Sequence, residues 1–239
     1  MEEQFSRTEK LIGKQALDTL RQAHVAVFGI GGVGGYVVEA LARTGIGTLT
    51  LVDSDTVSPS NLNRQIIALH STLGRTKVEV AKERVLDINP SATVYTENVF
   101  YLPETATRFD FSQYDYIVDT IDTVSGKMQL VLCAQAANVP ILCSMGAGNK
   151  WDPTAFSVAD IYQTSVCPLA KVMRSLCRKN GIRQLKVIYS KEPPLTSADG
   201  DRTPASVMFP PAAAGLAIAA EVIKDLICGS NKNDASKNQ

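Results

Sequence analysis

The sequence predicts an α/β protein built on a doubly wound, mostly parallel β-sheet, with antiparallel strands in its C-terminal part. Three observations lead to this prediction. Short segments rich in Val, Ile and Thr alternate with longer amphipathic segments up to residue 145, a glycine-rich turn follows the first of them, and the alternation changes after Gly148. Strands that alternate with helices are typical of a parallel sheet covered by helices on both faces.

The elements of the N-terminal part follow in order. Ser6 and Glu9 have the spacing of a capping box, which predicts a first helix that ends near Gln22. After it, short apolar runs predict strands and longer periodic runs predict helices. The predicted elements are strand 24–28, helix 32–44, strand 48–53, helix 75–88, strand 92–99, strand 115–120, helix 124–138 and strand 140–145.

The C-terminal part has a different pattern. Its predicted elements are strand 155–161, helix 168–180, strand 185–190 and helix 212–228. Residues 191–207 combine Pro, Thr, Ser, Asp and Gly, which predicts a mobile crossover loop, and the polar residues 229–239 predict a disordered tail. The length fits one domain over 1–228, with a nucleotide-binding part at about 1–150 and a substrate and dimer part at about 151–228.

Composition narrows the class of protein. The chain has 239 residues and a formal net charge of +0, so it has no bulk basic character for nonspecific nucleic-acid binding. The sequence begins with a polar, acidic stretch that is unlike a signal peptide. No run reaches the ~18 apolar residues of a membrane span. We therefore expect a cytoplasmic protein without a membrane partner.

The run VAVFGIGGVGG, from Val25 to Gly35, is the most informative motif. A short strand leads into a glycine turn, and the turn opens a helix. In such a motif Gly29 permits the tight turn, Gly31 lets the backbone approach a phosphate, and Gly34 lets the helix pack close to the strand. The helix N-terminus then presents unpaired N–H groups and a positive dipole to an anion. The motif predicts a bound nucleotide.

Polar residues after the second strand indicate which nucleotide. Asp53 follows the glycines by about 20 residues, the spacing at which an acidic side chain meets a ribose hydroxyl. The run DSDTVSPSNLNRQ then supplies groups that suit a triphosphate rather than a nicotinamide cofactor. Arg64 can hold phosphate oxygens with its planar fork, and Asn61 and Gln65 are neutral donors. An ordinary surface ion pair is the alternative for Arg64.

Lys77 and Asp122 extend this cluster. Lys77 begins helix 75–88, from which an ammonium can reach a β- or γ-phosphate, and Asp122 falls at the carboxyl edge of the sheet. A carboxylate beside phosphates implies a Mg²⁺ ion between them, to which Asp55 could contribute. The structural alternatives are an ion pair of Lys77 with Glu79 or Glu83, and a helix-capping role for Asp122.

Taken in this order, the motifs GIGGVG, DSDTVSPSNLNRQ, GRTKVEVAKERV and VDTID resemble the adenylating superfamily of ubiquitin-activating enzymes and their bacterial ThiF- and MoeB-type relatives. The resemblance covers roughly residues 5–165. It implies a Rossmann-like adenylation fold, binding of ATP and Mg²⁺, and transfer of AMP to a substrate carboxylate. In homodimeric members an N-terminal arginine enters the neighbouring subunit's site, and Arg7 occupies that place. The resemblance assigns nucleotide contacts to Gly29, Gly31, Gly32 and Gly34, ribose to Asp53, phosphates to Asn61, Arg64, Gln65 and Lys77, and the metal to Asp122.

Cysteines and the second half of the chain bear on the substrate. Members that activate ubiquitin-like sulfur carriers commonly carry paired CxxC zinc motifs, and the five cysteines here form none. Cys167 is the one thiol placed for thioester chemistry, with an inert, partly buried thiol as the alternative. The blocks RTEKLIG, LARTGIGTLTLVD, SNLNRQI and GAGNKWDPTAFSVADIYQTSVCPLAKVMR instead resemble the tRNA threonylcarbamoyladenosine dehydratases. That resemblance implies ring closure on a modified tRNA adenosine, with a cysteine-desulfurase-type sulfur-transfer protein as a candidate further partner.

A basic segment agrees with an RNA partner. Between Lys171 and Lys191 there are seven basic residues and no acidic one. At helical spacing, Lys171, Arg174 and Arg178 form one stripe, and Leu169, Val172, Met173 and Leu176 face the other way. A solvated helix face is the alternative, but without acidic neighbours in a neutral protein an anionic partner is favoured.

Three other functions remain open at this point. One is activation of the C-terminus of a ubiquitin-like sulfur carrier of the ThiS or MoaD type. Another is an NAD-dependent oxidoreductase, for which neither of the two histidines is an obvious proton-transfer group. The last is a nucleotide-binding adaptor without catalysis.

Overall fold

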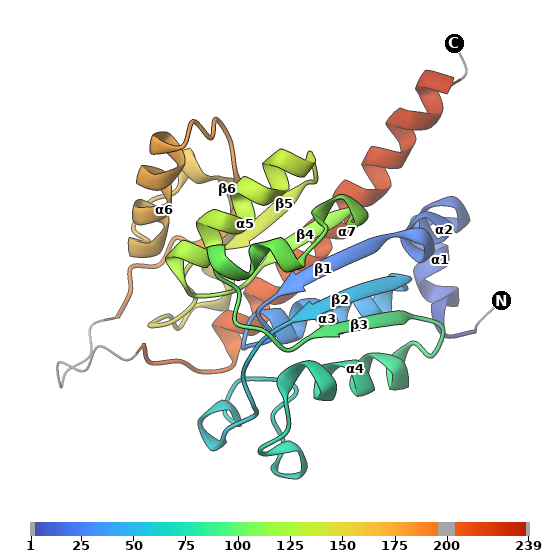
Figure 1. The fold of residues 1–239 in the computed structure, drawn as a ribbon. Helices are drawn as coiled ribbons and strands as arrows, with labels where there is room; N and C mark the ends of the chain where they lie inside the picture. The colour runs from blue at the N-terminus through green and yellow to red at the C-terminus, as the bar shows by residue number, and fades with distance from the viewer. Residues whose placement is uncertain (1–2, 196–203, 238–239) are drawn as a thin grey trace.

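The computed structural model describes residues 3–195 and 204–237, and its core is one seven-stranded sheet (Figure 1). The strand order is β3-β2-β1-β4-β5-β7-β6, and all pairs are parallel except β7 with β6. This confirms the predicted doubly wound sheet with an antiparallel C-terminal part. The strands are β1 (His24–Phe28), β2 (Thr48–Val52), β3 (Thr93–Glu97), β4 (Tyr116–Asp119), β5 (Ile141–Ser144), β6 (Phe156–Asp160) and β7 (Lys186–Ser190).

Helices cover both faces of the sheet (Figure 1). On one face α3, α4 and α7 pack together over a large apolar cluster, and on the other α5 and α6 cover two smaller clusters. This arrangement buries the strands on both sides, as their continuous apolar sequences require. The helices are α1 (Ser6–Ile12), α2 (Lys14–Gln22), α3 (Gly34–Thr44), α4 (Lys77–Ile88), α5 (Val124–Ala137), α6 (Pro168–Lys179) and α7 (Phe209–Lys237).

The predicted first helix is wrong in two respects. Gly13 adopts φ 86° and divides it into α1 and α2, since a left-handed backbone interrupts the helical hydrogen bonds. Ser6 is the first helical residue rather than its cap, because a short 3₁₀ turn, Glu3–Phe5, precedes it. The predicted capping box is therefore absent.

The C-terminal helix is longer than predicted. α7 begins at Phe209 and continues to Lys237, so residues 229–237 are helical rather than disordered. An established helix adds residues at little cost, which explains how it extends into a polar sequence. Most of the predicted mobile loop, 196–203, and residues 238–239 lie outside the described residues. Among the described helices, none has the length and apolar character needed to cross a bilayer.

A polar cleft at the carboxyl edge of the sheet

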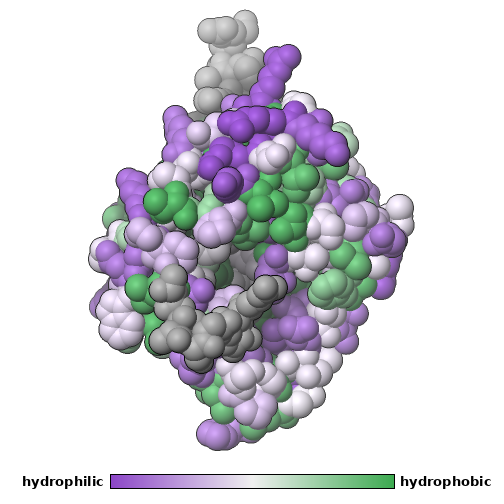
Figure 2. Space-filling model, turned by 90° about the vertical axis from the view of Figure 1, so that its left-hand side faces the viewer, coloured by the Kyte–Doolittle hydropathy of each residue, from purple (hydrophilic) through white to green (hydrophobic). Residues whose placement is uncertain are grey.

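The candidate site is a cleft of about 320 Å³ at the carboxyl ends of the first four strands. Its walls come from the turn after β1, the segment after β2, the residues after β3 and the loop between β4 and α5. Figure 2 shows the side of the molecule on which these strands end, and this face is hollowed near its centre. In doubly wound sheets, ligands bind at this edge, where the strand order reverses between neighbouring strands.

The glycine turn has the geometry that its sequence predicts. Gly29 has φ 90°, and a Cβ there would lie 2.8 Å from the Thr120 carbonyl carbon. A Cβ on Gly34 would lie 1.8 Å from the Gly29 oxygen, so α3 packs against the turn as only glycine allows. By contrast, a Cβ on Gly31 would have only Gln65 Nε2 nearby, at 3.9 Å. The backbone of Gly31 is thus open to the cleft, and no side chain caps the start of α3.

Asp53 holds the glycine turn from the end of β2. Its carboxylate accepts hydrogen bonds from the backbone N–H of Ile30, at 2.6 Å, and of Asp55, at 2.8 Å. Burial raises the pKa of the Asp53 carboxyl, and the nearby Lys77 ammonium and these two amides offset only part of the effect. The carboxylate therefore lies on the cleft wall, where a ribose would be in reach, and it also fixes the shape of the turn.

Lys77 is buried and points to the carboxylates of the cleft rather than along its own helix. Its Nζ is 2.7 Å from Asp55 Oδ2 and 4.0 Å from Asp53 Oδ1. The alternative pairings with Glu79 and Glu83 are not observed. Glu79 accepts a hydrogen bond from Thr96 Oγ1, and Glu83 binds Arg75. An ammonium held between two carboxylates at the cleft wall is ready to move onto an entering phosphate.

The three polar residues from the run after β2 differ in their availability. Arg64 is half-buried, and its Nη1 donates to the Ser60 carbonyl and to Asn63 Oδ1; no carboxylate pairs with it among the described residues. Asn61 uses its Oδ1 to accept the Ser58 N–H. Gln65 is buried, and its Oε1 has no hydrogen-bond partner in the described structure. Buried polar atoms are nearly always paired, so a hydrogen-bond donor that enters the cleft, from a ligand or a water, could satisfy this oxygen.

The loop between β4 and α5 closes the cleft. Asp122 is exposed at its rim and does not cap α5, because Thr123 is the N-cap residue and has no side-chain cap bond. Thr120 Oγ1 donates to the Gly29 oxygen, at 2.6 Å, and joins this loop to the glycine turn. Lys127, which was not predicted to contribute to the site, also supports this loop through its own helix, α5.

Lys127 and Asp119 form a fully buried ion pair with 0% exposure of both side chains. Lys127 Nζ lies 3.0 Å from the Asp119 carboxylate and donates to the Ile121 carbonyl at 2.9 Å. The sequence signal for it is helical spacing, because Lys127 falls on the same face of α5 as the buried Leu130 and Ala134. The pair therefore holds the backbone in place where β4 ends and the cleft begins.

Two sets of predicted residues lie away from the cleft. Arg7 is exposed on α1, which lies beyond the amino ends of the strands, at the opposite end of the sheet (Figure 1). On α6, Lys171 and Arg178 are exposed, whereas Arg174 is half-buried and donates to the Thr164 carbonyl at 2.8 Å. The structure does not bring either set into the cleft of the same chain.

The basic segment is less uniform than its sequence suggests. Lys186 is neutralised by Glu221 and Asp225 of α7, at 3.0 and 2.7 Å, which the local sequence could not reveal. Met173 is buried as expected and Leu169 and Leu176 are partly buried, but Val172 is exposed, and Ala170 and Cys177 are buried as well. Helix α6 thus packs through one narrow face.

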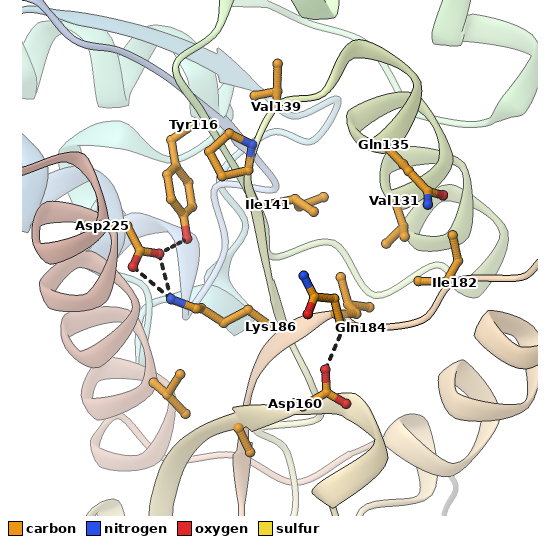
Figure 3. Close-up of a pocket in the computed structure, with 14 residues that line it drawn as sticks. Tyr116, Val131, Gln135, Val139, Ile141, Asp160, Ile182, Gln184, Lys186 and Asp225 are labelled. Atoms are coloured by element: carbon orange, nitrogen blue, oxygen red, sulfur yellow. Dashed lines mark hydrogen bonds and ion pairs between the residues drawn. The ribbon is translucent and has the colours of Figure 1, made fainter. Parts of the chain in front are cut away.

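The five cysteines are all free thiols, and Cys167 is buried at the start of α6. Burial keeps its sulfur from an external carbonyl, which disfavours a thioester role. A larger, mainly apolar pocket of about 650 Å³ lies at the amino ends of β4, β5 and β7 (Figure 3). Figure 3 shows that Asp225 bonds both Tyr116 and Lys186 at one end of it, so these three side chains already have partners.

The cleft suits a nucleoside triphosphate and one divalent ion. The open backbone at Gly31 and the two cations could bind phosphates, whereas the Gln65 oxygen and the Asp53 carboxylate could accept hydrogen bonds from hydroxyl or amino groups of a nucleoside. No cluster of three or more metal-ligating side chains occurs in the described residues. Mg²⁺ bound through phosphates needs only one or two carboxylates, and Asp122 and Asp55 both line the cleft.

Comparisons with known proteins agree with this cleft. The tRNA threonylcarbamoyladenosine dehydratase of Bacillus subtilis is 42% identical over 240 residues, which are 94% of each chain. Crystal structures of the E. coli enzyme of that name, TcdA, in complex with AMP and with ATP are 32% identical, with TM-scores of 0.90 over 96% of both chains. The model of the ThiF family matches residues 5–239. The chain therefore belongs to the ThiF family.

Proposed function

We propose that this chain is an ATP-dependent tRNA threonylcarbamoyladenosine dehydratase. The observation that carries the proposal is the cleft itself, in which the open backbone of the glycine turn and the cations Arg64 and Lys77 line a space for a triphosphate. Relatives of this name extend over nearly the whole chain, and one of them was solved with ATP and with AMP. Fold and cleft thus support the same activity.

The chemistry begins with a carboxylate oxygen of the modified adenosine, which attacks the α-phosphorus of ATP. An O–P bond forms, and the bond to the leaving pyrophosphate breaks. Both reactants are negative, so the barrier is largely electrostatic. Lys77 leaves its carboxylate partners for the phosphates, and Arg64 grips them with its fork. A ureido nitrogen then attacks the activated carbonyl carbon, loses its proton and expels AMP, so that one water is removed overall.

Mg²⁺ is part of the proposal. The exposed carboxylate of Asp122 stands at the rim of the cleft beside the expected phosphates, with Asp55 as a second contributor. When bound, the ion would neutralise phosphate charge. This chain's own part is to hold the rim in place, through Thr120 to the glycine turn and through Lys127 to α5.

We further propose a homodimer in which Arg7 acts in the cleft of the partner. Helix α1 contains no buried residue, and Leu11 on it is 85% exposed. Ile12 packs partly against the core, but a helix this short is marginal unless another surface covers the rest of it. Because Arg7 lies at the end of the sheet opposite its own cleft, a second copy is the direct route to a phosphate.

The tRNA partner would lie along α6. Lys171 and Arg178 are exposed there, and the structure shows no ion pair for either of them within the described residues. Phosphate contacts of this kind weaken as salt rises. With such a function, we expect the protein in the cytoplasm. The resemblance also keeps a cysteine-desulfurase-type sulfur-transfer protein as a candidate partner, which co-purification tests.

The decisive experiment is ATP consumption with purified tRNA that carries, or lacks, the threonylcarbamoyl group. We expect pyrophosphate and AMP only with the modified tRNA, and a product nucleoside that is lighter by one water in mass analysis. Consumption of ATP with a ubiquitin-like sulfur carrier and not with modified tRNA would contradict the proposal. So would stabilisation of the protein by NAD and not by ATP.

A further inference from the structure

Two aromatic side chains stand exposed beside the proposed site and contact each other. Trp151 is 62% exposed and Phe209 is 56% exposed, and their rings meet edge to face with centroids 6.4 Å apart. They come from segments far apart in sequence, the loop after β5 and the first turn of α7. Met208, next to Phe209, is also exposed. Apolar side chains gathered in this way on a surface mark an interaction site.

The aromatic pair is held rigidly. The backbone N–H groups of Trp151 and Asp152 donate to the Glu192 carboxylate at 3.0 Å, and the Lys150 ammonium donates to the Glu192 carbonyl. The side chain of Asp152 then caps the 3₁₀ turn that follows. Because the backbone is fixed before any partner arrives, binding to Trp151 costs little conformational entropy. Such an exposed and anchored aromatic is suited to recognition rather than to packing.

The pair adjoins the nucleotide cleft. Pro211, two residues after Phe209, would lie 3.4 Å from a Cβ on Gly32 of the glycine turn. Asn63, beside Arg64, donates to the Ser206 carbonyl at 2.9 Å, and Asn149 exchanges two hydrogen bonds with Ala205. These contacts join the loop after β5, the start of α7 and the phosphate-facing segment. A group seated on the aromatic pair is therefore a neighbour of the reacting phosphate.

The charge around the pair favours a nucleic acid over an apolar protein segment. The start of α6 borders the same loop, since Cys167 Sγ lies 3.8 Å from a Cβ position on Gly146. From that start, exposed basic residues continue along the helix with no acidic residue between Lys171 and Lys191. Unpaired bases in RNA loops stack on aromatic side chains while basic residues contact the backbone. The combination matches a single-stranded RNA loop.

We propose that Trp151 and Phe209 form a stacking platform for an unpaired nucleobase of the RNA substrate. This inference rests on the proposed function, because it places the RNA loop beside the ATP cleft. The platform would fix the loop while the modified adenosine extends its carboxylate toward the α-phosphate. One base–aromatic stack corresponds to a change in affinity of about 10- to 100-fold.

The test uses the fact that Trp151 is the one tryptophan of the chain. An unmodified anticodon stem-loop should quench its fluorescence, and a fully paired duplex of equal length should not. With labelled stem-loop, Trp151→Ala should weaken binding about 10- to 100-fold, Trp151→Phe should retain most of the affinity, and ATP binding should stay unchanged in both. Tyr95→Ala is the matched control, since Tyr95 is 55% exposed on edge strand β3; it should leave RNA affinity unchanged.

Two results would overturn the platform. One is wild-type stem-loop affinity for Trp151→Ala, and the other is equal quenching by the duplex and the stem-loop. Neither result depends on catalysis, because the stem-loop carries no threonylcarbamoyl group. Quenching by the stem-loop together with no conversion of modified tRNA would reject the proposed function while leaving the platform in place. If wild type and Trp151→Ala both convert modified tRNA and bind RNA with equal affinity, the platform is rejected and the proposed function is kept.

Discussion

At the carboxyl edge of the sheet lies the polar cleft of about 320 Å³, and at the amino edge lies the apolar pocket of about 650 Å³ (Figure 3). The smaller cavity contains a left-handed glycine, a buried carboxamide oxygen without a partner and an arginine free of carboxylates. In the larger one, Lys186, Asp225 and Tyr116 satisfy one another. The smaller cavity is thus the one with polar groups that remain available to a ligand.

The largest effect is expected at the carboxyl edge, on the free energy of unfolding, when the buried ion pair loses its lysine. Lys127→Met leaves the Asp119 carboxylate at 0% exposure without its cation, and we expect a loss of about 3–5 kcal/mol in the free energy of unfolding. Urea unfolding measures it. Asp119→Leu combined with Lys127→Met should recover much of the loss, because no buried charge then remains. A single-variant loss below about 1 kcal/mol would show that water reaches the pair.

Of the two cavities, only the polar cleft should support catalysis. Arg64→Ala would remove the proposed phosphate contact, and we expect a fall of about 10²–10³ in the rate of pyrophosphate release with modified tRNA. Lys186→Ala, at the other edge, should leave that rate unchanged. Near-wild-type turnover for Arg64→Ala, or a comparable fall for Lys186→Ala, would contradict the assignment of catalysis to the polar cleft.

The glycine turn allows a finer test within the cleft. Gly31→Ala has space for its methyl group and should not lower the melting temperature, but it should weaken ATP binding about tenfold by blocking the approach of a phosphate to the backbone. Gly29→Ala should instead destabilise the fold, because its Cβ would meet the Thr120 backbone. Thermal unfolding and ATP titration separate the two. Unchanged ATP affinity in Gly31→Ala would show that no phosphate binds against the Gly31 backbone.

The smallest effect is expected at the amino edge, at alkaline pH. Burial lowers the pKa of Lys186, but the carboxylates of Asp225 and Glu221 outweigh burial and raise it above its ordinary value. This stabilisation is complete below the unfolded pKa of about 10.4 and is lost as the pH rises through the folded pKa. Wild type should thus lose slightly more stability than Lys186→Met above pH ~10. Because the lysine side chain is 36% exposed, the difference should stay below about 1 kcal/mol.

Much of the site could be predicted because its residues follow strands. Gly29, Asp53 and Asp122 all come just after a strand of one parallel sheet, so their order along the chain places them at one edge. Lys77 was predicted on the correct helix, but its ion-pair partner Asp55 was not. That contact joins segments 22 residues apart across a loop whose course no periodicity describes.

By itself, the sequence determined the seven strands, the glycine turn and the set of polar residues at the carboxyl edge, because strand and turn preferences are local and repeat with fixed periods. Only the tertiary structure decided that Lys127 is buried on Asp119, that α7 neutralises Lys186, and that Trp151 meets Phe209. Each of these contacts joins residues of different elements. Which side chains meet there depends on how helices pack on the sheet, and local sequence does not record that packing.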